Sequence, residues 1–222
     1  MGRRVLPKID PTVDYSRHLG FVEELSVPFS PDDLFSRNAD LEIEIGSGKG
    51  LFLLNASREN PNRNFLGNEI AKKYARFAAY RFAKHRCENA RMLQGDGLRL
   101  FHELLPDECA VAVHVYFPDP WWKERHRKRR VMQPDFVADV FRALKPGGTL
   151  HFWSDVEEYF ESTCEIVPEH ANFEGPFAVA EPPAEHDMDY RTHFERRMRK
   201  NGHPVFRCQF QKPVKVTVAA DS

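Results

Sequence analysis

From residue 41 onward, the hydrophobic residues of the chain form short apolar runs separated by amphipathic stretches. The alternation of Leu41 to Ile45 predicts a strand that leads into a glycine-rich turn, and residues 51–60 repeat like a helix. The same patterns predict further strands at residues 64–70, 90–94, 109–117, 149–153 and 205–211, and further helices at residues 71–86, 134–144, 156–167 and 191–200. Strands that alternate with helices at this spacing predict an α/β fold, with helices on both faces of the sheet.

These patterns indicate one domain with a segment at each end. Residues 1–39 are rich in Pro, Asp and Ser and show no sustained period, so we expect a loosely ordered N-terminal arm. Residues 40–212 hold the predicted elements, and residues 213–222 are expected to form a C-terminal tail. A chain of 222 residues, 41% of them apolar, is long enough for one sizeable core and short for two. The Pro-rich connection at residues 174–187 is assigned no role.

Composition narrows the class of protein. The sequence has no run of about 18 apolar residues and no apolar stretch near its start, so we expect neither a membrane span nor secretion, but a cytoplasmic protein. The four cysteines stand far apart in the sequence without a C-x-x-C pair, which argues against both a metal site and a disulfide framework.

The net charge of −1, from 32 Lys and Arg against 33 Asp and Glu, at first argues against a nucleic-acid partner. The charge is, however, unevenly distributed along the chain. Residues 72–91, 121–130 and 191–200 together hold 18 of the bases and only three of the acids. An electrostatic field depends on where charges lie, so the basic segments still fit an enzyme that binds RNA on one face.

Carboxylates follow or end five consecutive predicted strands. They are Glu44, Glu69, Asp96, Asp119 and Asp155. Each alone fits a helix cap or a turn. In an open parallel sheet, however, ligands bind at the carboxyl ends of the strands, so five carboxylates at one edge predict a binding site there.

The glycine turn after the first of these strands indicates which ligand is bound. Gly46 and Gly48 let the backbone approach a ligand closely, although such a turn is shared by dinucleotide and nucleoside sites. Glu69, about 20 residues further on, is placed to accept hydrogen bonds from ribose hydroxyls, and Asp96 to accept one from an adenine amino group. Glu44 would repel a pyrophosphate but suits an ammonium and a sulfonium, which favours S-adenosyl-L-methionine over NAD.

One long motif identifies a family. Residues 117–130 read FPDPWWKERHRKRR, residues 44–50 read EIGSGKG, and residues 192–195 read THFE. Through these motifs, residues 40–211 resemble the tRNA (guanine-N7)-methyltransferases of the TrmB type. The first motif is long and specific, whereas the glycine turn and the THFE segment are weak without it.

The resemblance implies a Rossmann-like class I S-adenosylmethionine-dependent methyltransferase fold, whose mostly parallel sheet has seven strands. It also implies roles for single residues. It assigns cofactor contacts to Glu44, Glu69, Asp96 and Asp119, and it also makes Asp119 the active-site residue. It assigns substrate contacts to Lys123, Asp155, Thr192 and Glu195. It assigns RNA contacts to Arg125, Arg127, Lys128, Arg129 and Arg130. By the same resemblance the substrate is a guanine at position 46, in the variable loop of tRNA, and the product of the cofactor is S-adenosyl-L-homocysteine.

The chemistry of the substrate agrees with this interpretation. Guanine N7 has a free lone pair, so it attacks the methyl group in line without first losing a proton, and holding the two reactants in place dominates catalysis. Asp119 is therefore expected to act by positioning and electrostatics rather than as a base, unless it only caps a tight turn between Pro118 and Pro120. The sequence does not decide whether Trp121 and Trp122 stack a flipped base or pack under the loop.

Two other classes of function stay open. A small-molecule methyltransferase would need an apolar lid and no basic rim, and the basic run at residues 125–130 counts against it. An RNA-binding module without catalysis would not need the intact carboxylates. We expect tRNA as the partner, no membrane, no required protein partner, and a monomer or a homodimer.

Overall fold

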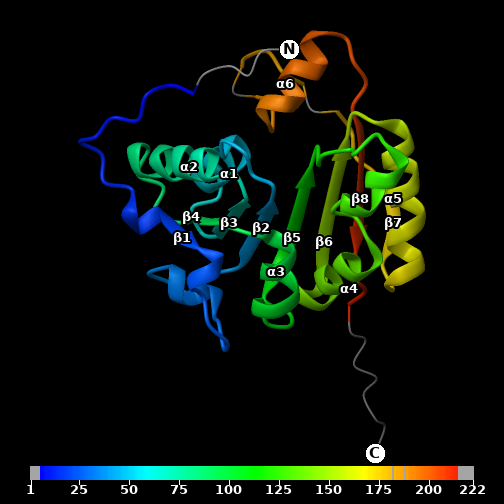
Figure 1. Cartoon of the computed structure of the whole chain (residues 1–222), viewed down its shortest axis with the longest axis horizontal. Coiled ribbons are helices and arrows are strands. Elements are labelled where there is room, and N and C mark those ends of the chain that lie inside the picture. Colours follow the sequence, from blue (N-terminus) through cyan, green and yellow to red (C-terminus); the bar gives the residue numbers. More distant parts are fainter. Residues whose placement is uncertain (1–5, 182, 188, 215–222) are drawn as a thin grey trace, which may run out of the picture.

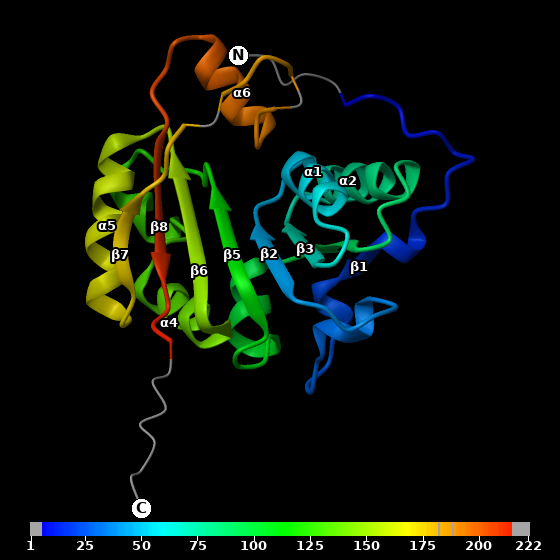
Figure 2. The ribbon, with the colours of Figure 1, turned by 180° about the vertical axis from the view of Figure 1, so that it is seen from behind.

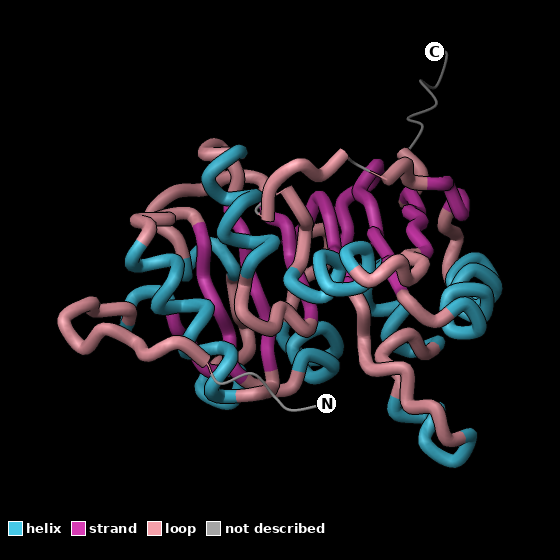
Figure 3. The backbone as a smooth tube through the Cα atoms, turned by 90° about the horizontal axis from the view of Figure 1, so that it is seen from above, coloured by secondary structure: helices cyan, strands magenta, loops and turns pink. Residues whose placement is uncertain are grey.

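Alternating side chains along the central strands place two hydrophobic clusters on the two faces of one sheet. The computed structural model describes residues 6–181, 183–187 and 189–214. Leu41, Ile43 and Ile45 point into one cluster, which also contains side chains from the turn at Leu100–Leu104 and from the helices Pro134–Ala143 and Glu157–His170. The other face packs against the helices Leu51–Glu59 and Lys72–Lys84. The strands thus lie between two layers of helices, as Figures 1 and 3 show.

The sheet has eight strands in the order β1-β4-β3-β2-β5-β6-β8-β7. Their bounds are Leu19–Phe21 for β1, Leu41–Ile45 for β2, Asn64–Glu69 for β3, Ala90–Gln94 for β4, Ala110–Tyr116 for β5, Leu144–Ser154 for β6, Glu174–Ala178 for β7 and Phe206–Gln211 for β8. The strands β1 to β6 pair in parallel, and β8 pairs antiparallel with both β6 and β7. The predicted α/β class with a mostly parallel sheet is confirmed, although the expected number of seven strands is one too low.

The helices follow the strands in the order the sequence predicts. They are α1 at Leu51–Glu59, α2 at Lys72–Lys84, α3 at Gly97–Arg99 with a wider turn over Leu100–Leu104, α4 at Pro134–Ala143, α5 at Glu157–His170 and α6 at His193–Lys200. Short 3-10 helices occur at Ser16–His18, Val22–Glu24, Pro31–Leu34 and Glu124–Arg129. None of the helices in the described ranges is long and apolar enough to cross a membrane.

The two ends of the sheet differ from the prediction. Residues 16–24, expected in a loosely ordered arm, include β1, which pairs with β4 and leads to the fully buried Val22. The Pro-rich connection contains β7, whose five residues are all exposed. Neither strand shows a hydrophobic alternation, because β1 is only three residues long and β7 has no buried side chain. The first five residues of the arm and residues 215–222 of the expected tail lie outside the described residues.

One boundary and one helix also differ. The helix predicted to end at Leu144 ends at Ala143, because β6 already begins at Leu144 and continues through the Gly147–Gly148 pair. The pattern does not predict α3 or the turn that follows it, in which the amide of Leu105 bonds the carbonyl of Leu100 at 2.9 Å.

Candidate active site

The order in which the chain adds strands to the sheet reverses between β2 and β5. These strands lie side by side, with β3 and β4 beyond β2 and with β6 beyond β5. All five strands are parallel, so their carboxyl ends lie together at the upper edge of the sheet in Figure 1. The helix α6 lies above this edge in both Figure 1 and Figure 2. An open α/β sheet binds its ligands at such a switch point.

The glycine turn after β2 leaves open space. Gly46 and Gly48 have φ values of +73° and +54°, and a Cβ added to either would meet no atom within 4 Å. The turn is held from its other side, because the amide of Ser47 donates to the carbonyl of Asn68 at 2.9 Å. The chain therefore presents a backbone cradle that side chains on these glycines would fill.

Glu69 joins this turn to the start of α2. Its carboxylate accepts the amide of Gly48 at 2.8 Å and the amide of Ala71 at 2.7 Å. Burial raises the pKa of Glu69, and these two bonds act in the opposite direction. The charge of Asp119 also raises the pKa of Glu69, so carboxylates from two strands influence each other across the site.

Glu44 is the most deeply buried carboxyl group of the site. Its side chain is 3% exposed, and its Oε2 has no hydrogen-bond partner among the described residues. Burial raises the pKa of Glu44 to about 8, the charge of Glu69 adds to that effect, and Arg191 opposes it. A buried carboxyl group with a free oxygen fits a cationic ligand group, which would restore its ionised form.

The remaining carboxylates at this edge are more accessible. Asp96 is exposed and caps α3 by accepting the amide of Leu98 at 2.9 Å. Asp119 is exposed, and it lies between Phe117 and Trp121, whose φ values of 52° and 45° are unusual for non-glycine residues. Asp155 is half-buried directly after β6. The five carboxylates thus lie at one edge, as the sequence predicts.

The loop after Asp119 carries a run of exposed cations. Lys123, Arg125, Arg127, Lys128 and Arg129, hereafter the cationic loop, are all exposed. Arg127 pairs with Glu158 at 3.4 Å, and the guanidinium of Arg129 lies 5.1 Å from the ring of Trp121. Trp122 is 72% exposed, so the two tryptophans have different surroundings.

Arg130 differs from these neighbours. It is 6% exposed, and two of its guanidinium nitrogens donate to the carboxylate of Glu158 in α5 at 3.1 and 2.6 Å. Its Nε donates to the carbonyl of Pro120 at 2.8 Å, and its guanidinium lies 4.4 Å from the ring of Tyr159. In this structure Arg130 fixes the end of the loop that carries Asp119, and the expected contact of Arg130 with RNA stays a prediction.

Thr192 and Glu195 also have internal partners. The hydroxyl of Thr192 accepts the amide of Glu195 at 3.0 Å, which caps α6. Glu195 is fully buried, and it accepts the amide of Arg191 at 2.6 Å. These side chains form a cap like that described for T-x-x-E sequences. The structure therefore uses both side chains to hold α6, and their expected contact with a substrate stays a prediction.

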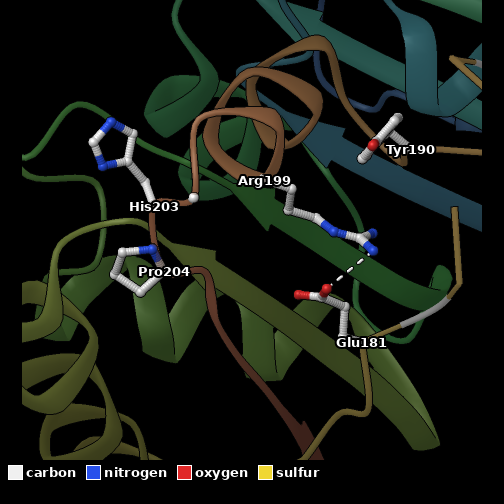
Figure 4. A pocket seen from close by; sticks show the side chains of 6 residues that line it. Glu181, Tyr190, Arg199, His203 and Pro204 are labelled. Atoms are coloured by element: carbon white, nitrogen blue, oxygen red, sulfur yellow. Dashed lines mark ion pairs between the residues drawn. The ribbon is translucent and has the colours of Figure 1, made fainter.

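A network of two glutamates and two arginines fastens α6 to β8. Arg199 pairs with Glu195 at 3.2 Å and with Glu181 at 3.0 Å, and Arg207 pairs with the same two glutamates at 3.3 and 3.0 Å. Figure 4 shows the pocket beside this network, where Arg199 reaches Glu181 and Tyr190 lies nearby. Of the residues that line this pocket, Arg199 and Glu181 are paired with each other, and the guanidinium of Arg199 lies 5.0 Å from the ring of Tyr190.

Arg191 is the site residue that sequence reasoning missed. It precedes the α6 cap, and its guanidinium donates to the hydroxyl of Tyr116 at 2.8 Å. The same guanidinium lies 5.2 Å from the ring of Phe52 and 5.3 Å from that of Trp153. It thus connects α6 to α1, β5 and β6. No motif or period marks this arginine, because its partners are far away in the sequence.

Comparison with known proteins gives consistent results. A family model described as "Putative methyltransferase" matches residues 38–208. The tRNA (guanine-N(7)-)-methyltransferase of Rhodopirellula baltica is 46% identical over 96% of this chain and 80% of its own length, and that of Nitrosococcus oceani is 34% identical over 84% and 78%.

Solved structures share the fold. The 16S rRNA methyltransferase KamB superposes with a TM-score of 0.59 at 15% identity, over 87% of this chain and 98% of that one. A 16S rRNA (adenine(1408)-N(1))-methyltransferase from Catenulisporales acidiphilia, solved with its cosubstrate, gives a TM-score of 0.55 at 15% identity, over 80% and 87%.

Proposed function

The chain belongs to the tRNA (guanine-N(7)-)-methyltransferases, and from this premise we propose that it methylates N7 of the guanine at position 46, in the variable loop of tRNA, using S-adenosyl-L-methionine. The single observation that carries the proposal is the arrangement at the switch point. There, the buried Glu44 with its free oxygen lies under an open glycine cradle, and Asp119 leads from that edge into the cationic loop.

The residues of the cradle fit the cofactor. Gly46 and Gly48 leave room for it, Glu44 suits its ammonium group, and Glu69 and Asp96 suit its ribose and its adenine. Ile70, directly after Glu69, and Leu98, two residues after Asp96, are 71% and 47% exposed and offer apolar surface to a flat ring. When bound, S-adenosyl-L-methionine supplies an electrophilic methyl group on a sulfonium.

Asp119 is placed to hold the guanine. An ionised aspartate only accepts hydrogen bonds, so it can orient N–H groups of the base and stabilise the positive charge that develops on the purine. Arg130 supports this role, because it binds the carbonyl of Pro120, the next residue in the chain. Asp155, at the end of the neighbouring strand, is a second acceptor on the substrate side.

The cationic loop is placed to bind the phosphates beside the target base. Lys123, Arg125, Lys128 and Arg129 are exposed, and the exposed ring of Trp122 can stack on a base that leaves its helix. The helix α6, which lies over the site, carries Arg and Lys residues and does not form an apolar lid, which argues against a small-molecule substrate. We expect the enzyme to act in the cytoplasm, as a monomer or homodimer without a second kind of subunit.

A labelling experiment tests the proposal. The protein is incubated with S-adenosyl-L-methionine carrying a radiolabelled methyl group and with unmodified tRNA, and the product is treated with borohydride and aniline. We expect label in the RNA and strand cleavage at position 46, and neither in a tRNA whose guanine at that position is replaced by adenine. Cleavage at another guanine would refute the position, and unlabelled RNA would refute the function.

An Asp119→Asn variant tests the assigned residue. We expect turnover to fall by roughly two orders of magnitude, as is typical when one electrostatic contact to a transition state is lost. The variant should unfold at the same denaturant concentration as the wild type, because Asp119 is exposed. Turnover within twofold of the wild type would remove Asp119 from the mechanism.

A further inference from the structure

The basic side chains of the described residues differ in whether they have an acidic partner. Many cations outside α2 lie within 4 Å of a carboxylate. These are Arg63, Arg99, Arg127, Arg130, Arg142, Lys145, Arg196, Arg199, Lys200 and Arg207. In contrast, among residues 6–181, 183–187 and 189–214, no ion pair involves Lys72, Lys73, Arg76 or Lys84 of α2. We call these four residues the α2 surface.

The α2 surface lies on the solvent side of its helix. All four side chains are exposed, while Ala75, Ala78 and Phe82 are fully buried against the sheet. The helix contains no Asp or Glu between Lys72 and Lys84. At 1.5 Å per residue, the four cations extend over about 18 Å, which is the length of several nucleotides rather than of one.

Neighbouring groups hold the α2 surface in place without neutralising it. The ammonium groups of Lys73 and Lys84 lie 5.0 and 5.8 Å from the rings of Tyr74 and Tyr80. Arg76 donates to the hydroxyl of Tyr15 through two nitrogens at 3.2 and 3.0 Å, which ties the N-terminal arm to the helix.

The acids of the arm form no ion pair with the α2 surface among the described residues. Hydrogen bonds with Thr12 lower the pKa of Asp10, and the charge of Lys84 adds to that effect, so one acid of the arm lies near one end of this surface. Asp10 accepts the amide of Thr12 at 2.9 Å, and Asp14 accepts the amide of Ser16 at 2.9 Å, so both carboxylates close turns of the arm itself. Most of the positive charge of the α2 surface thus has no ion-pair partner among the described residues and can bind a partner outside the chain.

The position of this helix connects the α2 surface to the active site. Lys72 follows Glu69 by three residues, and α2 begins at the carboxyl end of β3, whereas the cationic loop follows β5. Two strand spacings separate β3 from β5, which is roughly 10 Å. The two cationic surfaces therefore flank the carboxylates, and only a polyanion much larger than a nucleotide can touch both.

We propose that the α2 surface is a second tRNA-binding surface, which contacts backbone phosphates outside the loop that is methylated. This inference rests on the proposed function. It assigns the cationic loop to the region of the target guanine and α2 to the body of the tRNA. Phosphate contacts hold an RNA without reading its sequence, so the α2 surface contributes affinity for the tRNA.

Salt-dependent binding tests the inference. We compare Lys73→Gln/Lys84→Gln with the matched control Arg99→Gln/Lys145→Gln, which removes the same charge from cations already paired with Glu103 and Asp40. The first variant should bind whole tRNA about tenfold more weakly, and the slope of log K against log salt should fall by about 1.4 to 1.8, since each lost phosphate contact contributes about 0.7 to 0.9. The control should retain the wild-type slope.

Two further measurements separate this inference from the function itself. The affinity for S-adenosyl-L-methionine and kcat at saturating tRNA should stay unchanged in Lys73→Gln/Lys84→Gln, because these side chains do not touch the reacting groups. If the wild type methylates tRNA and both double variants bind it with equal affinity and slope, the α2 surface is refuted and the function stands. If the wild type transfers no methyl group to tRNA, the function itself fails.

Discussion

The guanidinium of Arg191 donates a hydrogen bond to the hydroxyl of Tyr116 at 2.8 Å, which links the start of α6 to the end of β5. A chain of bonds continues from there, since Nδ1 of His114 lies 2.9 Å from the same hydroxyl and Nε2 of His114 lies 2.9 Å from Glu42. Burial lowers the pKa of His114, so the ring is neutral, with Nε2 donating to Glu42 and Nδ1 accepting from Tyr116. The helix above the site is thus bonded to the polar interior of the sheet.

Replacement of Arg191 by Met should therefore loosen α6. The change leaves the buried hydroxyl of Tyr116 without its donor and removes the contacts to three aromatic rings, so we expect the free energy of unfolding to fall by about 2 to 3 kcal/mol. Denaturant titration measures it. The control is Arg197→Met, which removes an exposed cation lying 4.4 Å from the ring of Phe194 and should cost below about 1 kcal/mol. Equal losses in the two variants would contradict a special role for Arg191.

Glu44 should make the ligand-free protein less stable as the pH rises. The pKa of Glu44 is raised to about 8 by burial, against 4.5 for the free side chain, so the native state binds more protons than the unfolded state between these values. Stability from this group falls by at most about 1.4 kcal/mol per pH unit through that window, and it is constant below 4.5 and above 8. Glu44→Gln should remove this slope, which unfolding experiments at pH 5 and pH 8 can measure.

Glu42, two residues earlier on the same strand, provides the opposite case. Burial opposes its ionisation, but hydrogen bonds with His114 and Arg63 outweigh burial and lower the pKa of Glu42 to about 2. Its contribution to stability is present above pH 4.5 and is lost as the pH falls toward 2. Glu42→Gln should therefore destabilise the protein at pH 7 and matter little at pH 2. A Glu44→Gln variant with the same pH profile as Glu42→Gln would refute the assigned environments.

The sequence predicts the site to the extent that chain order determines it. Five carboxylates each lie at the end of a strand or shortly after it, and parallel strands bring their carboxyl ends together, so the common edge is predictable without coordinates. They are Glu44, Glu69, Asp96, Asp119 and Asp155. The partner of a side chain is not predictable in this way. Arg130 lies in a basic run, yet its side chain is buried and pairs with Glu158 of a helix that is distant in the sequence. Thr192 and Glu195 belong to a motif with two interpretations, and only the structure shows the internal cap.

The difference between Arg130 and Arg125 can be measured. Arg130→Gln removes the two guanidinium bonds to Glu158 and leaves the carbonyl of Pro120 without its donor, so we expect a loss of about 2 to 3 kcal/mol in the free energy of unfolding. Arg125→Gln should change stability by less than about 0.5 kcal/mol, because Arg125 is exposed, but should weaken tRNA binding and lower its salt slope by about 0.7 to 0.9. If only the Arg130 variant lowered the salt dependence of tRNA binding, then Arg130 and not Arg125 would be the residue that contacts RNA.

Two glycine variants distinguish the open side of the cradle from its packed side. A Cβ on Gly67 of β3 would lie 2.4 Å from Cδ1 of Leu53 and 2.7 Å from Oγ of Ser47, so the core and the turn must shift. Gly67→Ala should cost about 1 to 3 kcal/mol of stability, as overpacking does. Gly46→Ala should cost about 1 to 2 kcal/mol, from its positive φ alone, because its Cβ meets no atom within 4 Å.

The two variants should differ more clearly in ligand binding. The methyl group of Gly46→Ala enters the space where we place the cofactor, so its affinity for S-adenosyl-L-methionine should fall at least tenfold, which calorimetry can measure. Gly67→Ala acts on the cradle only through Ser47, whose amide and hydroxyl donate to the carbonyls of Asn68 and Glu44. In this variant the free energy of cofactor binding should therefore change by less than the free energy of unfolding. Unchanged affinity in Gly46→Ala would show that the cofactor does not lie against this turn.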